Sequence, residues 1–259
     1  MQTPVTAPRE AVRAETHTGA VRLQDVVKRF APARRDETAV TALDGVTLDV
    51  APGEIVVVVG PSGCGKTTLL ELVCGLLAPD AGTVHAAPAA LMAQDDLLLP
   101  WATALDNAAL ALRVAGLSRA AARAQAGRLL SDFGLTGFEH SYPRELSGGM
   151  RQRVAFARTL LAGRALLCLD EPFASLDALT RQEMQAWLAQ ALARDPRSVL
   201  LVTHDVEEAL VLGDRVVVLS PRPGRVVATL PVDAPRPRRR TDPALVALRE
   251  RVLEELGSR

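Results

Sequence analysis

The sequence contains no apolar run near the roughly 20 residues that a helix needs to cross a bilayer. Its longest apolar runs, such as Ile55–Val59 and Val199–Val202, have the length of buried strands. The first 20 residues are mostly Thr, Ala, Pro and charged residues, without the apolar segment of a secretory signal. We therefore expect a disordered tail over residues 1–20 and a cytoplasmic chain that reaches a membrane only through a partner.

An excess of one charge is also absent, because 30 Lys and Arg residues balance 30 Asp and Glu residues. This balance excludes bulk electrostatic attraction to nucleic acid or anionic lipid, so we expect no nucleic-acid partner. The one local exception is the basic run from Pro235 to Arg240, for which a solvated loop is favoured over a binding patch.

Cysteine is scarce. Cys64, Cys74 and Cys168 form no CxxC pair, and apolar or glycine-rich neighbours surround each of them. A disulfide framework and a zinc site are therefore not expected, and we predict three reduced thiols.

The chain does contain strand-like runs that alternate with helical stretches, in an ordinary globular balance of 48% hydrophobic and 23% charged residues. This alternation predicts an α/β core with a mainly parallel sheet. Residues 95–161, rich in Ala, Leu and Arg, predict a helical lobe inserted into that core, with Ser118 capping one helix. The expected strands are Val21–Phe30, Val46–Val50, Ile55–Val59, Ala165–Leu169, Val199–Val202 and Val216–Leu219, and the expected helices are 67–77, 176–192 and 243–256.

A phosphate-binding loop follows the third of these strands, where Gly60–Thr67 reads GPSGCGKT and fits the pattern GxxxxGK[ST]. Its glycines let backbone N–H groups curl around a phosphate, and the next helix turns its positive N-terminus toward the same anion. We expect Lys66 to reach the β- and γ-phosphates and the Thr67 hydroxyl to bind Mg²⁺. The nucleotide-binding candidates of this loop are Gly60, Pro61, Ser62, Gly63, Cys64, Gly65, Lys66, Thr67 and Thr68.

Two carboxylates follow a later apolar strand. Asp170 at the strand end is expected to bind Mg²⁺, and Glu171 to polarise the water that attacks the γ-phosphate. His204 ends another apolar strand in the same way. A lone histidine is more often structural than catalytic, but on the sheet edge that holds the phosphates it becomes a candidate γ-phosphate contact.

The segment Leu146–Met150, LSGGM, resembles the LSGGQ signature of ABC ATPases and stands just ahead of the carboxylate strand. Ser147, Gly148 and Gly149 begin a helix, and the free N–H groups at its N-terminus form a second phosphate-binding site. In that family the signature of one subunit covers ATP held by another, so the resemblance implies two subunits enclosing two ATP molecules. Met150 replaces the usual glutamine, and Ala93 stands where an aromatic residue is usual.

Other positions also resemble the family, over about residues 21–230. Gln94 resembles the glutamine that senses Mg²⁺, Asp177 belongs to a D-loop-like SLD segment, and Phe30 resembles the aromatic residue that stacks on adenine. A strand-end Phe is equally often a core residue. The resemblance implies a P-loop NTPase core with N-terminal antiparallel strands. It divides the chain into an ATPase domain over 21–232 (core 21–94 and 162–232, helical lobe 95–161) and a basic loop with a helix over 233–259. It also implies ATP and Mg²⁺ as cofactors, with Glu171, His204 and Lys66 as catalytic residues and Thr67, Gln94 and Asp170 as Mg²⁺ ligands.

The segment Leu97–Trp101, LLLPW, with Asp106-Asn107 after it, resembles the LLPW…DN pattern of the nitrate, sulfonate and taurine importer group, which also includes importers of pyrimidine precursors of thiamine. The implied partners are a second ATPase subunit, identical or paralogous, transmembrane permease subunits, and indirectly a periplasmic or surface solute-binding protein. The implied location is the cytoplasmic face of the inner membrane. Trp101 is expected to anchor the permease, the alternative being that it packs inside the helical lobe.

Rival functions are a soluble ABC ATPase of DNA maintenance or translation, an exporter subunit, and a module that binds ATP without hydrolysing it. The first usually carries long coiled-coil insertions or tandem cassettes, whereas the two phosphate motifs are close here and one cassette is present. Glu171 and His204 argue against the last.

Overall fold

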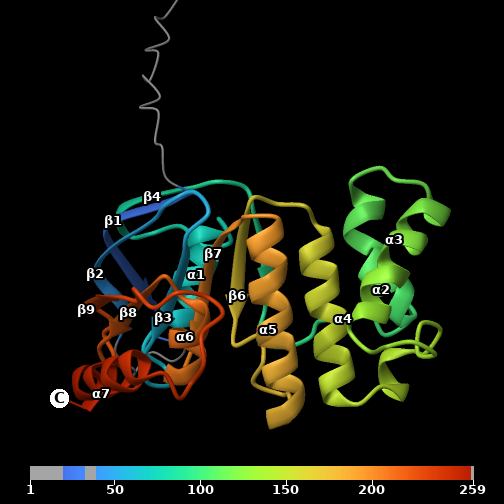
Figure 1. Cartoon of the computed structure of the whole chain (residues 1–259). Coiled ribbons are helices and arrows are strands. Elements are labelled where there is room, and N and C mark those ends of the chain that lie inside the picture. The colour runs from blue at the N-terminus through green and yellow to red at the C-terminus, as the bar shows by residue number, and fades with distance from the viewer. Residues whose placement is uncertain (1–19, 33–38, 258–259) are drawn as a thin grey trace, which may run out of the picture.

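The computed structural model describes residues 20–32 and 39–257, so the predicted tail lies outside the described residues except for Ala20. Its strands form two sheets, and a group of helices lies to one side of them (Figure 1). The three-stranded sheet has the order β2-β1-β4, and the six-stranded sheet has the order β5-β6-β7-β3-β8-β9. The strands are β1 Val21–Phe30, β2 Val40–Val50, β3 Ile55–Val59, β4 Ala81–Ala86, β5 Ala89–Met92, β6 Leu166–Asp170, β7 Ser198–Thr203, β8 Arg215–Leu219 and β9 Val226–Pro231.

The six-stranded sheet is parallel from β5 to β8, and β9 joins its edge antiparallel. Every residue of β3, β6 and β7 is buried, which explains the apolar runs that make up β3 and most of β6 and β7, since strands covered on both faces have no polar side. The predicted parallel core is therefore confirmed. Because the strands are parallel, the carboxyl ends of β3, β6 and β7 meet at one edge of the sheet.

The small sheet is antiparallel, as the resemblance implied, with β1 between β2 and β4. The predicted start of β2 at Val46 was wrong, because β2 begins at Val40. Residues 40–43 pair with the end of β1, where Phe30 lies opposite Val40. This pairing is a tertiary contact, which the local sequence does not predict. This extension brings Phe30 and Val40 side by side at the end of the sheet.

The first helix, α1 Lys66–Val73, is shorter than the predicted 67–77. The N–H of Cys74 bonds back to the Leu70 carbonyl, and Gly75 has φ +70°, the left-handed conformation that commonly ends a helix. The expected strands and helices did not include β4, β5, β9 or the short helix α6 Val206–Leu212. The other core helices, α5 Ala178–Arg194 and α7 Pro243–Gly257, lie within two residues of expectation.

The helical lobe contains α2 Ala104–Val114, α3 Arg119–Asp132, the 3-10 turn η1 Pro143–Glu145 and α4 Gly148–Leu161. The predicted cap is confirmed, since the Ser118 hydroxyl accepts from the N–H of Ala121 at 3.2 Å. Buried Asn107 fastens the loop before α2, accepting from the N–H of Leu99 at 2.8 Å and donating back to its carbonyl at 3.1 Å. Trp101 on that loop is 74% exposed, so the alternative that it packs inside the lobe is wrong.

The basic run before α7 is exposed at four of its six residues, as expected of a solvated loop, but some of its arginines also bind α6. Arg238 donates to the carbonyls of Leu210 and Gly213 at the end of α6, and Arg240 pairs with Glu207 at 3.0 Å. The Arg238 guanidinium group thus satisfies carbonyls that a helix end leaves without partners. The buried apolar residues of α7 belong to the main core, while the division of the chain at residue 233 stays a prediction.

Within the described residues, no helix has the length and apolar character needed to cross a membrane. The three cysteines are free thiols, and Cys64 and Cys168 are buried.

Candidate functional site

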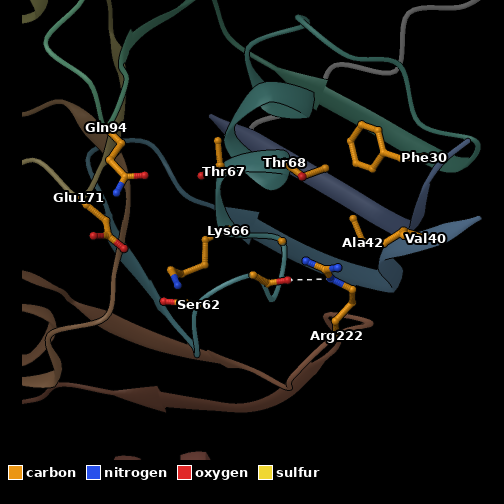
Figure 2. A pocket seen from close by; sticks show the side chains of 12 residues that line it. Phe30, Val40, Ala42, Ser62, Lys66, Thr67, Thr68, Gln94, Glu171 and Arg222 are labelled. Atoms are coloured by element: carbon orange, nitrogen blue, oxygen red, sulfur yellow. Dashed lines mark hydrogen bonds between the residues drawn. The ribbon is translucent and has the colours of Figure 1, made fainter. Parts of the chain in front are cut away.

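A cavity of about 310 Å³ opens where the two sheets meet, and Figure 2 shows the side chains around it. Phe30 and Val40 lie at one end, and Gln94 and Glu171 lie at the other, with the phosphate loop between them. The sequence-predicted residues that line it are Phe30, Ser62, Gly63, Gly65, Lys66, Thr67, Thr68, Gln94 and Glu171. Val40, Ala42 and Arg222 also line it and were not predicted.

Glycine is required in the loop by its close contacts. A Cβ on Gly60 would lie 2.8 Å from the Cys64 sulfur, and one on Gly65 would lie 2.7 Å from the Leu43 side chain. Gly65 is also the N-cap of α1, with φ +105° and no side-chain cap, so the first N–H groups of the helix have no side-chain acceptor. A loop of this shape with a free helix N-terminus is a ready site for a phosphate group.

Lys66 supplies a positive charge inside this loop. The residue is 7% exposed, and its ammonium group donates to the carbonyls of Gly60 at 2.8 Å and Pro61 at 3.1 Å. These bonds hold the cation across the mouth of the loop. A buried ammonium group needs such partners, because an isolated charge is costly to take out of water.

Asp170 is the last residue of β6 and does not line the cavity. Burial raises the pKa of this carboxyl group, and a hydrogen bond with Thr67 opposes the increase. The described residues include no group of three or more His, Cys, Asp or Glu side chains that could hold a metal alone. Mg²⁺ nevertheless often takes only a few oxygen ligands from the protein, because phosphates and water complete its coordination shell. The hydroxyl of Thr67, the carboxylate of Asp170 and the amide of Gln94 are oxygen donors that fit that ion.

Glu171 and His204 form a pair at the end of neighbouring strands β6 and β7. A Glu171 carboxylate oxygen lies 3.1 Å from His204 Nδ1, and the Glu171 N–H donates to the Val202 carbonyl at 2.9 Å. The Glu171 side chain is 14% exposed and that of His204 is 62% exposed. Glu171 has φ +45°, which is unfavourable for a residue with a Cβ and is typical of functional sites. His204 therefore contacts the cavity through Glu171 and does not line it.

The signature residues Ser147, Gly148 and Gly149 and the D-loop-like Asp177 do not line this cavity. They begin two helices instead. The Ser147 hydroxyl accepts from the N–H of Met150 at 3.3 Å, and the Asp177 carboxylate accepts from the N–H groups that open α5, which lowers its pKa. A Cβ on Gly149 would lie 3.2 Å from Leu176, so the two segments pack together. Their action on a partner's nucleotide stays a prediction.

A buried carboxyl group lies behind the Glu171–His204 pair. Glu208 of α6 is 3% exposed, and one of its oxygens accepts from the Thr203 hydroxyl at 3.1 Å. Its other oxygen has no hydrogen-bond partner among the described residues. Burial raises the pKa of Glu208 from 4.5 to about 8.

This pKa predicts that stability falls as pH rises. Between pH 4.5 and about 8 the unfolded chain has lost the Glu208 proton that the folded chain keeps, so raising the pH favours unfolding. Glu208→Gln removes this cost, and we expect it to raise the melting temperature by about 3–6 °C at pH 8 and by less at pH 5. Thermal melts at both pH values measure the difference, with exposed Glu183→Gln as control. An equal increase at both pH values would contradict the assignment.

Comparison with known proteins independently identifies the family of this chain. The ABC transporter family profile matches residues 43–174, a span that includes the phosphate loop, the signature and both carboxylates. The taurine import ATP-binding protein of Chromobacterium violaceum is 46% identical over 232 residues, covering 83% of this chain and 89% of that protein. An aliphatic sulfonates import ATP-binding protein of Rhodococcus jostii is 47% identical over 223 residues, covering 83% and 87%.

The fold matches a solved structure as well. An ATP-binding cassette determined as a dimer, in a post-hydrolysis state with ADP and Pi, aligns with a TM-score of 0.75 at 29% identity. The match covers 83% of this chain and 99% of that one.

Proposed function

This chain belongs to the ABC transporter family, and from that premise we propose that it is the ATP-hydrolysing subunit of an importer for taurine or a related sulfonate. The observation that carries the ATPase assignment is the Glu171 carboxylate, which lies at the end of the phosphate-loop cavity and 3.1 Å from His204. The names of the relatives from Chromobacterium violaceum and Rhodococcus jostii support the solute class. They give no support to a pyrimidine precursor or to a soluble, non-transport ATPase.

ATP fits the cavity in one direction. The adenine stacks on Phe30 at the end formed by β1 and β2, and the triphosphate lies in the loop with its γ-phosphate toward Gln94 and Glu171. Lys66 turns its ammonium group toward the β- and γ-phosphates. Thr67, Asp170 and Gln94 would hold Mg²⁺, which would neutralise phosphate charge there.

Hydrolysis then follows from the strand-end pair. Glu171 accepts a proton from a water molecule whose oxygen attacks the γ-phosphorus, and the bond to the β–γ bridging oxygen breaks to give ADP and phosphate. His204 holds the Glu171 carboxylate in position and stabilises charge on the γ-phosphate. Lys66 stabilises the same developing charge.

Two copies of the chain are needed to enclose each ATP. The signature end of α4 has N–H groups without intrahelical partners, and it does not line the cavity of its own subunit. We therefore place Ser147, Gly148 and Gly149 of one copy on the γ-phosphate held by the other, with Asp177 near the contact. The dimeric cassette to which the chain is similar supports this arrangement. Contacts made only in the closed pair let ATP shift the pair toward closure.

The permease docks on the helical lobe. Trp101 and Leu97 are 74% and 63% exposed on the loop that Asn107 fastens, and they offer an apolar anchor for a membrane subunit at the cytoplasmic face. Closure of the two ATPase subunits would move these lobes and change the side to which the permease opens.

A transport assay tests the solute. In proteoliposomes that contain the chain, its permease subunits and its solute-binding protein, we expect taurine or a short alkanesulfonate to raise ATP hydrolysis about tenfold over the unliganded binding protein. A hydroxymethylpyrimidine should give no increase. Stimulation by the pyrimidine alone would reject the sulfonate assignment while leaving the ATPase assignment in place.

A further inference from the structure

One cation in the cavity belongs to none of the expected motifs. Arg222 lies in the loop between β8 and β9, and its Nε donates to the carbonyl of Gly63 in the phosphate loop at 3.0 Å. Figure 2 shows its guanidinium group on the side of the cavity where Ala42 and Val40 lie, away from Gln94 and Glu171. Together with its bond to Gly63, this places the residue where the adenine end of the cavity meets the phosphate loop.

The positive charge of Arg222 is not neutralised by a neighbour. No carboxylate of the described residues forms an ion pair with it, and the Gly63 carbonyl is its one recorded hydrogen-bond acceptor among them. Arg225 in the same loop differs, because it pairs with Asp44 through an Nε contact of 3.0 Å. A guanidinium group has five N–H donors, so most of those of Arg222 remain available to a ligand.

The loop that carries Arg222 is held firmly. The N–H of Gly224 donates to the Ala42 carbonyl at 2.9 Å, and the N–H of Asp44 donates to the Gly224 carbonyl at 3.0 Å. A Cβ on Gly224 would lie 2.1 Å from the Cys64 carbonyl oxygen, so the loop packs directly on the phosphate loop. A donor fixed in this way loses little conformational entropy when a ligand binds.

We propose that Arg222 is a nucleotide-binding residue that donates to the α-phosphate of ATP, an inference that rests on the function proposed above. Lys66 binds the β- and γ-phosphates from inside the loop, and Phe30 stacks on the base. The anionic group between them is the α-phosphate, and a planar guanidinium group is well suited to bind phosphate oxygens. Because the α-phosphate is common to ATP and ADP, Arg222 contributes to both and adds nothing to adenosine.

Titration of the purified chain with fluorescent analogues of ATP and ADP, competed by the natural nucleotides, tests this role. We expect Arg222→Gln to weaken ATP and ADP by a similar factor of about 5–10, the range of one charge-assisted hydrogen bond at a partly exposed site, and to leave adenosine binding unchanged. Arg222→Lys, which keeps the charge and loses the planar donors, should recover part of the loss. The loss should shrink as salt is raised.

Arg225→Gln is the matched control, because it removes the same charge from the same loop without touching the cavity. It should keep ATP affinity within about twofold of the wild type. Equal ATP affinities of the wild type and Arg222→Gln would overturn the inference, as would an equal loss in Arg225→Gln, which would assign the effect to the loop. If Arg222→Gln lost affinity for ATP alone, the contact would be with the γ-phosphate, and the inference would also be overturned. If the wild type itself bound neither nucleotide, the proposed function would fail instead.

Discussion

Glu171→Gln is expected to lower the ATPase rate about 100- to 1,000-fold while ATP still binds, which is the usual effect of losing a general base. Glutamine keeps the size of the side chain and can still contact His204, which lies 3.1 Å from the carboxylate. It cannot accept the proton of the attacking water. The substitution therefore separates binding from hydrolysis.

Phosphate release and nucleotide titration measure the two effects on the same sample. With hydrolysis blocked, ATP should also hold the chain as a dimer on size-exclusion chromatography, since the closed pair cannot discharge its γ-phosphate. Exposed Glu183→Gln on α5 makes the same chemical change outside the cavity and should hydrolyse ATP at the wild-type rate. A wild-type rate in Glu171→Gln would remove Glu171 from the mechanism.

Lys66→Ala is expected to weaken ATP binding itself, by about 100-fold, because two or more charge-assisted hydrogen bonds to phosphate are lost together. The residue is only 7% exposed, so no other side chain can take its place without moving the loop. Isothermal titration measures the affinity, and a thermal melt shows whether the fold survives. Unchanged ATP affinity in a folded Lys66→Ala protein would place the triphosphate elsewhere.

Mixing two inactive variants shows which subunit supplies the signature. Lys66→Ala damages the loop, and Ser147→Arg blocks the signature end of α4. A mixed dimer keeps one intact pair of loop and signature, so random mixing should restore roughly a quarter of the wild-type ATPase rate. If each nucleotide were enclosed by a single subunit, the mixture would stay inactive.

The residues that the sequence identified at strand ends are those that the structure brings to one edge. Asp170 ends β6, Glu171 follows it and His204 follows β7, and parallel pairing of these two buried strands aligns their ends without further information. Phe30 reaches the cavity for a different reason, namely the pairing of β1 with an unpredicted part of β2. Its place was available from family resemblance and not from local pattern.

Arg222 shows where sequence reasoning stops. Its position depends on the turn between β8 and the unpredicted β9 and on hydrogen bonds from Gly224 to β2, which is 180 residues away along the chain. No spacing rule connects such distant segments. Arg238 was missed for the same reason, because the helix end that it caps belongs to α6, whose seven residues gave no periodic signal.

The strand order has a mechanical consequence. β7 lies between β6, which carries Glu171, and β3, which carries the phosphate loop, and both ladders are continuous parallel pairings. These hydrogen-bonded pairings keep the distance between Glu171 and the phosphate loop constant while ATP is bound and hydrolysed. Under the proposed function, the change that starts hydrolysis must then come from outside this sheet, through the arrival or departure of a second copy of the chain.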